Sequence, residues 1–126
     1  MKNIILIPAL LAFIGLHSQT YSGSTGAIND VATNDFTCTV SGLSPAAIDT
    51  VLHGLETVQI NLTHTYDSDL KIQLISPDGT TVLLCNGVGG GGDDFTNTVF
   101  DSYAATSITS GSPPFTGTFT PQGTLG

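Results

Sequence analysis

Strict alternation of apolar and polar residues over two neighbouring stretches constrains the fold more than any other feature of this chain. Between residues 58 and 66, every second position is apolar, aromatic or histidine: Val58, Ile60, Leu62, His64 and Tyr66. The second stretch repeats the pattern with Leu70, Ile72 and Leu74. A period of two is typical of strands that bury one face. We therefore expect strands at 56–66 and 69–75, with His64 pointing inward.

A turn motif follows directly. Ser76-Pro77-Asp78-Gly79 combines a proline that fixes its own φ, an aspartate that can bond nearby backbone, and a glycine that tolerates the exit geometry. A further strand is expected at 80–86, which contains the apolar run Val82–Cys85. The pattern predicts an antiparallel hairpin with Pro77 and Gly79 at its tip.

The remaining sequence predicts no helix. The stretches 36–43 and 96–100 are expected to be further strands, and 44–54 a loop. Residues 102–126 are rich in Ser, Thr, Gly and Pro, with a few scattered apolar side chains. The predicted fold class is therefore all-β.

The first 18 residues have the form of a secretory signal peptide. A short positive start is followed by the apolar run Ile4–Gly15 and by the small residue Ser18. A membrane anchor is the alternative, but the run is shorter than the roughly 20 residues of a spanning helix. We expect export to the exterior or the cell surface, with residues 19–34 as an irregular lead-in.

The charge balance excludes some partners. Beyond residue 18, Lys71 is the only basic side chain against ten acidic ones. Such a chain repels phosphate backbones and anionic lipids, so we expect neither nucleic-acid binding nor membrane association beyond export.

The stretch from residue 60 to residue 80 resembles the P domain, or homo B domain, of kexin- and furin-like proprotein convertases. The matching residues are Ile60, Leu62, His64, Thr65, Asp69, Leu70, Leu74, Ser76, Pro77, Gly79 and Thr80. A looser similarity continues through 97–101, 104–108, 114–117 and 121–123, and P domains of secreted bacterial proteins are the most similar type. The resemblance implies a P domain over 35–126, folded as a jelly-roll β-barrel or sandwich of antiparallel strands. P domains usually continue into a Trp-containing strand beyond the equivalent of residue 123, so we expect the last strands to be missing.

The resemblance also implies a function. P domains are non-catalytic modules that pack on and stabilise a subtilisin-like serine protease, and in bacteria they accompany other exported domains. The expected partner is thus a protease or another domain of the same protein. The alternative is a stand-alone extracellular binding or adhesion domain. Motifs of catalytic sites such as G-x-S-x-G and H-E-x-x-H are absent from the sequence, so we expect no activity of the chain itself.

Three candidate sites remain. His64 and Asp69 fit the P-domain pattern, and we interpret them as a structural pair, with a ligand or proton-handling role as the alternative. The Gly-rich stretch 86–94 suggests calcium, with Asp93, Asp94 and Asp101 as ligands and Asp67 nearby, or else a flexible acidic loop. Cys38 and Cys85 form either one disulfide or two buried thiols.

Overall fold

A computed structural model describes residues 18–43 and 54–125 of the chain. The predicted signal peptide lies outside these residues except for Ser18, and the predicted loop 44–54 lies outside them except for Gly54. The described residues divide into two compact units, one before and one after the boundary between residues 40 and 41. No helix in the described part of the chain has the length and apolar character to cross a membrane.

The first unit contains no regular strand in its described residues. Its chain doubles back, with an isolated antiparallel bridge between Gly23 and Cys38 and a hydrogen bond from the Ser24 amide to the Thr37 carbonyl, 2.7 Å long. Asn34 closes the turn through hydrogen bonds with Asn29. The predicted strand 36–43 is therefore wrong. The side chains of residues 36–42 are exposed, since within the described residues no strand pairs with this stretch beyond the bridge.

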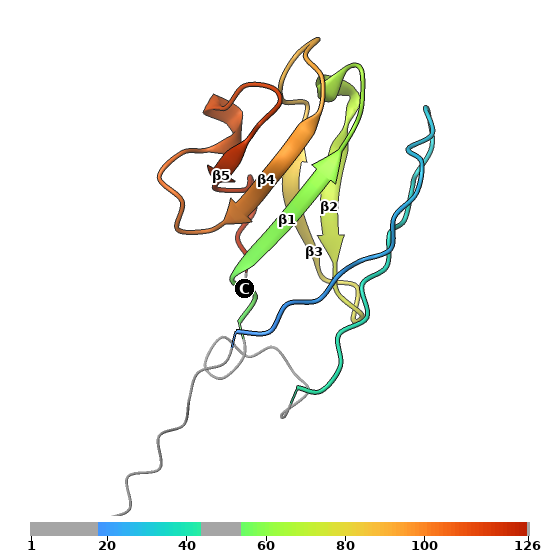
Figure 1. Ribbon diagram of the computed structural model, residues 1–126, viewed down its shortest axis with the longest axis vertical. Helices are drawn as coiled ribbons and strands as arrows, with labels where there is room; N and C mark the ends of the chain where they lie inside the picture. The colour runs from blue at the N-terminus through green and yellow to red at the C-terminus, as the bar shows by residue number, and fades with distance from the viewer. Residues whose placement is uncertain (1–17, 44–53, 126) are drawn as a thin grey trace, which may run out of the picture. The chain divides into compact units, whose positions relative to one another are not determined.

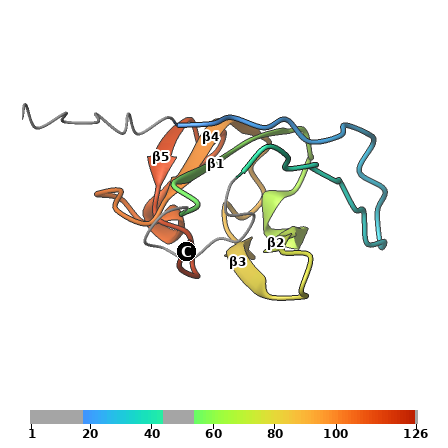
Figure 2. The ribbon, with the colours of Figure 1, turned by 90° about the horizontal axis from the view of Figure 1, so that it is seen from below.

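The second unit is an all-β sandwich, which confirms the predicted fold class. One sheet has the order β1-β4-β5 and the other pairs β2 with β3. The strands are β1 (Thr57–Leu62), β2 (Lys71–Ile75), β3 (Thr81–Asn86), β4 (Phe95–Asp101) and β5 (Gly117–Phe119). Two short 3₁₀ helices, η1 (Asp67–Asp69) and η2 (Ile108–Ser110), lie in the connections. Figures 1 and 2 show the two sheets stacked face to face.

The predicted hairpin is confirmed, although β2 begins two residues later and β3 one residue later than expected. β2 and β3 pair antiparallel, with Leu74 opposite Val82. At the tip, Gly79 has a φ of +89° and donates to the Ser76 carbonyl at 2.9 Å. The Asp78 carboxylate accepts from the Thr80 amide at 3.0 Å and from the Ser76 hydroxyl. The Ser76 hydroxyl holds the pKa of Asp78 below its usual value.

One pairing differs from the expected antiparallel pattern. β1 and β4 are antiparallel, but β4 and β5 are parallel, with Phe100 opposite Phe119. The connection between them carries residues 102–116 back to the same end of the sheet, and it includes η2. Parallel neighbours require such a crossover, whereas antiparallel neighbours need only a tight turn.

Both sheets and the C-terminal segment contribute to one apolar core. Its buried members are Leu84, Cys85, Val88, Phe95, Phe100, Ile108, Phe115, Phe119 and Leu125. Phe115 stacks on Phe95 with ring centroids 4.7 Å apart and meets Phe119 edge-on at 6.2 Å. The half-buried faces of β1 and β2 pack against this cluster. The scattered apolar residues of 102–126 are therefore central to the core.

Candidate functional site

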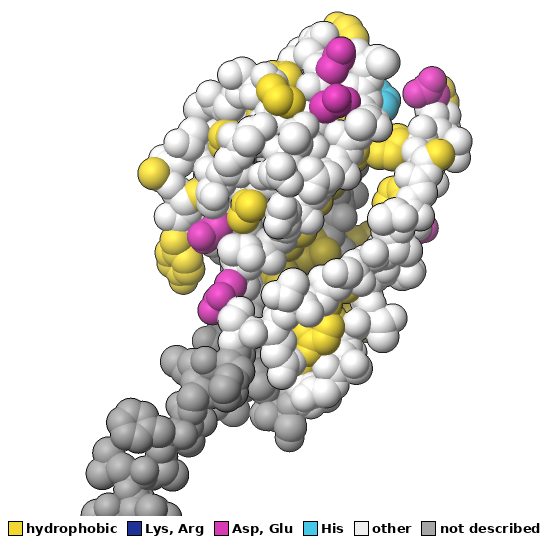
Figure 3. Space-filling model, in the orientation of Figure 1, with side chains coloured by type: hydrophobic (Ala, Val, Ile, Leu, Met, Phe, Trp, Pro, Cys, Tyr) yellow, Lys and Arg dark blue, Asp and Glu magenta, His cyan; other side chains and the backbone are white. Residues whose placement is uncertain are grey.

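The candidate site is at the end of the sandwich where the segment His64–Asp69 meets the glycine-rich loop Gly89–Asp94. Both segments are irregular, because β1 ends at Leu62 and η1 begins at Asp67. The space-filling view shows acidic side chains exposed at this end of the 41–126 unit, and others at its opposite end (Figure 3). We call the two segments together the acidic end.

Four hydrogen bonds hold the two segments of the acidic end together. The amides of Asp67 and Ser68 donate to the carbonyls of Gly92 and Gly90 at 2.9 and 3.1 Å. In the reverse direction, the Asp94 amide donates to the His64 carbonyl at 3.2 Å. The Asp94 carboxylate also accepts from the His64 amide at 2.9 Å. These hydrogen bonds fix the two segments of the acidic end against each other.

His64 lies beyond the end of β1 and is half-buried, not an inward-facing residue within a strand. Its ring Nδ1 lies 3.0 Å from the Tyr66 carbonyl oxygen and 3.2 Å from the Tyr66 amide nitrogen. The ring therefore fixes the bend into η1, either as donor or as acceptor according to its tautomer. Asp69 is exposed at the end of η1. Its pairing with His64 stays a prediction, while Tyr66 and Asp94 are partners that the structure shows.

The three aspartates predicted to bind calcium are not brought together. Asp93 and Asp94 precede β4, whereas Asp101 ends it, so the strand separates them by about 20 Å. The Asp101 carboxylate accepts from the Tyr103 amide at 2.8 Å. Within the described residues, no three side chains of His, Cys, Asp or Glu are placed to hold a metal ion by themselves. Asp101 is therefore excluded from a site shared with Asp93 and Asp94.

Asp67 is the residue of the acidic end whose burial could not be predicted from the sequence. Its side chain is fully buried, although Asp69, two residues later, is exposed. Burial raises the pKa of the Asp67 carboxyl; the Asp94 backbone amide acts in the opposite direction, and the Asp94 carboxylate raises the pKa further. Two aspartates in one short turn look alike in sequence, and only the packing of the glycine-rich loop distinguishes them.

The two cysteines are free thiols in the structure, Cys38 exposed and Cys85 buried. Burial raises the pKa of Cys85 to about 12, and the nearby Asp67 carboxylate raises it as well. A thiol in this state is a poor nucleophile at neutral pH. The disulfide between Cys38 and Cys85 stays a prediction.

Alkylation under native conditions tests the state of the thiols. We expect iodoacetamide at pH 8 to label Cys38 in the folded protein, and Cys85 only after unfolding, because the reactive thiolate of Cys85 is strongly disfavoured. Mass spectrometry of the tryptic peptides gives the labelled fraction of each residue. If neither cysteine is labelled in denaturant until a reductant is added, they are bridged and the free-thiol state is wrong.

Comparison with known proteins identifies a related domain. Residues 55–113 match the family model of the proprotein convertase P-domain. The leupeptin-inactivating enzyme 1 of Streptomyces exfoliatus is 40% identical over 60 residues, which are 48% of this chain and 13% of that protein. No solved structure matches the chain significantly. The matched range begins before β1 and ends after η2, so it includes the whole acidic end.

Proposed function

Residues 55–113 belong to the proprotein convertase P-domain family, and on this premise we propose that the chain is a non-catalytic accessory module of a secreted bacterial enzyme. The module packs on a hydrolytic domain of the same protein and stabilises it. A subtilisin-like serine protease of the convertase type is the partner domain that the family suggests, and other exported hydrolases are the wider class.

The observation that carries this proposal is the proportion of the bacterial relative that is matched. That protein is named as an enzyme that inactivates leupeptin, yet the similar segment spans 13% of its length. Most of the relative therefore lies outside the shared segment. An arrangement in which a small β-sandwich accompanies a larger enzymatic part agrees with an accessory role.

The geometry of the sandwich supports the same role. His64 is the single histidine of the described residues, and both its backbone and its ring are bonded to neighbouring backbone or to Asp94. A general base for peptide hydrolysis must instead reach a nucleophile or a water. The chain therefore supplies structure to its partner, and the partner supplies the chemistry.

The test starts from the exported proteins of the source organism. We expect peptides of residues 55–113 in the culture medium within a polypeptide heavier than the 12.9 kDa of this chain, and in an active hydrolase band on a zymogram. Deleting residues 55–125 from that polypeptide should shorten the half-life of its activity on heating, while the purified chain alone hydrolyses no peptide. If the exported product has the mass of this chain or less, the chain is a stand-alone binding domain and the proposal fails.

A further inference from the structure

The carboxylate of Asp67 is in an unfavourable position as an isolated group. None of its side-chain surface is exposed, and neither of its oxygens has a hydrogen-bond partner within 3.5 Å among the described residues. The Asp94 amide is close enough to lower the pKa of the carboxyl, but this effect is smaller than the opposing effect of burial. An ionised carboxylate buried in this way is strongly destabilising, so proteins either neutralise such a group or let it coordinate a cation.

The charges around Asp67 favour a cation. Asp94, His64 and Asp93 all interact electrostatically with its carboxyl, and the two aspartates raise its pKa. Asp67 in turn raises the pKa of the buried Cys85 thiol on β3. Two further carboxylates thus lie within electrostatic range of Asp67, in a chain whose basic residues are Lys2 and Lys71. Lys71 is exposed at the start of β2.

The glycine-rich loop brings carbonyl oxygens to the same place. The Gly92 and Gly90 carbonyls already accept from the amides of Asp67 and Ser68, and each has a second lone pair. The backbone at Gly89 comes so close that an added Cβ would lie 2.9 Å from the Asp67 Cβ. Only glycine permits this approach of loop backbone to a buried carboxylate.

We propose that the acidic end is a calcium-binding site in which the Asp67 carboxylate is the central ligand. Asp93 or Asp94 and carbonyl oxygens of the Gly89–Gly92 loop complete the coordination. Calcium fits because it takes six to eight oxygens in irregular geometry, including backbone carbonyls, whereas magnesium demands a near-ideal octahedron. Carbonyl ligands are necessary, since the side chains of the described residues do not assemble a metal site by themselves.

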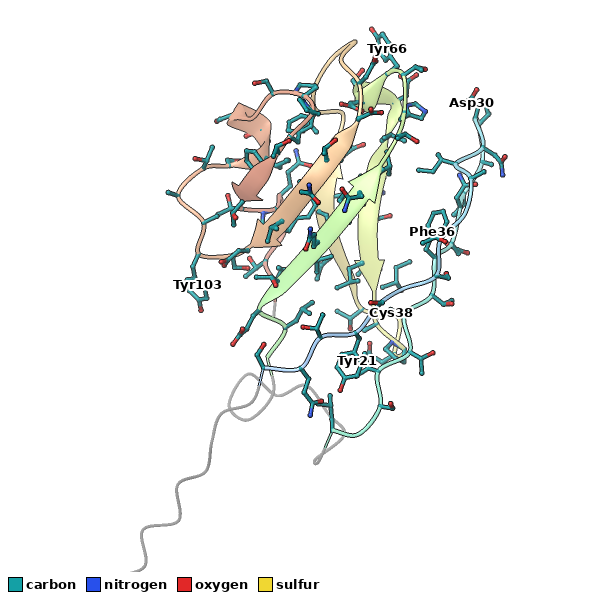
Figure 4. The ribbon with its side chains drawn as sticks, in the orientation of Figure 1. Tyr21, Asp30, Phe36, Cys38, Tyr66 and Tyr103 are labelled. Atoms are coloured by element: carbon teal, nitrogen blue, oxygen red, sulfur yellow. The ribbon has the colours of Figure 1, made fainter. Side chains whose placement is uncertain are left out.

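Terbium luminescence tests whether a cation binds at this end of the sandwich. Tb³⁺ replaces Ca²⁺ at oxygen sites and is sensitised by a nearby tyrosine, and this chain has no tryptophan. Tyr66 lies against the loop, with its Cε2 atom 3.1 Å from a Cβ added at Gly91, whereas Tyr103 is at the opposite end of the unit (Figure 4). We expect calcium-displaceable luminescence in the full chain that Tyr66→Phe removes and Tyr103→Phe retains.

The ligand role of Asp67 is tested by stability in calcium against chelator. We expect calcium at tenfold excess over its Kd to raise Tm by about 5 °C or more, with a Kd of about 10⁻⁴–10⁻³ M, as in extracellular modules. Asp67→Asn should weaken binding by about tenfold or more, because it removes the buried charge and keeps the shape. Asp101→Asn is the matched control, an acid at the far end of β4, and should bind calcium as the unsubstituted chain does.

Two results would overturn the proposal. One is the absence of any calcium-dependent change in Tm or luminescence up to about 10 mM, well above the Kd range of extracellular sites. The other is an Asp67→Asn variant that binds calcium as tightly as the unsubstituted chain. Should Asp67→Asn fail to fold, the Tb³⁺ luminescence of Tyr66→Phe and Tyr103→Phe still decides: a signal that Tyr66→Phe retains and Tyr103→Phe loses would place the cation away from the acidic end.

Discussion

Replacing Phe115 by alanine is expected to lower the free energy of unfolding by about 3–5 kcal/mol. The ring is fully buried, stacks on Phe95 and meets Phe119 edge-on, so its removal opens a cavity at the centre of the sandwich. The Phe115 carbonyl also accepts from the buried Thr98 hydroxyl at 2.8 Å, and this bond survives the substitution. The expected loss is a large part of the free energy of unfolding of a small domain, which is about 5–15 kcal/mol.

Urea denaturation followed by circular dichroism measures this loss. Phe36→Ala is the control, since Phe36 is 45% exposed and belongs to the other compact unit. We expect it to change stability by no more than about 0.5 kcal/mol. A Phe115→Ala variant that loses less than about 1 kcal/mol would show that this ring is not part of the core.

Gly89→Ala is expected to destabilise the sandwich by about 2–4 kcal/mol, from two sources. Its φ of +85° disfavours any side chain. An added Cβ would also lie 2.9 Å from the Asp67 Cβ and 2.9 Å from the Phe115 Cε2 atom, and such crowding costs about 1–3 kcal/mol.

Gly90→Ala separates these two sources. Gly90 also has a positive φ, +57°, but an added Cβ would meet nothing within 4 Å. We expect it to cost only the backbone contribution, about 1 kcal/mol. The difference in Tm and in free energy of unfolding between the two variants measures the crowding against Asp67. Equal losses would mean that the loop moves away freely and that its approach to Asp67 is not constrained.

Local signals predicted much of the fold. The alternation at Val58, Ile60 and Leu62 specified β1, and the Ser76–Gly79 turn specified the hairpin, because both depend on residues close in sequence. The strand expected at 96–100 is β4 with bounds one residue wider at each end. Family resemblance added the sandwich architecture, which periodicity alone does not give.

Tertiary packing determined what the sequence could not predict. The alternation at 36–43 predicted a strand, but a strand forms only when it pairs with another strand. In the described chain, the bridge to Gly23 is the only such pairing of this stretch. Phe115 and Ile108 are isolated among polar residues, so their burial depends on how the crossover returns to β4. Likewise, Asp67 and Asp69 differ only in which of them the glycine-rich loop covers.

The order of strands in the β1-β4-β5 sheet has a consequence for how fast the chain folds. The β2–β3 hairpin closes through a turn of a few residues, and its entropy of closure is small. In contrast, the pairing of Leu62 with Phe95 closes a loop that contains the whole hairpin, so its entropy of closure is larger. The parallel β5 joins later still in sequence, through its own crossover. Such non-local contacts place folding on the millisecond-to-second scale, with the hairpin as the part that forms first.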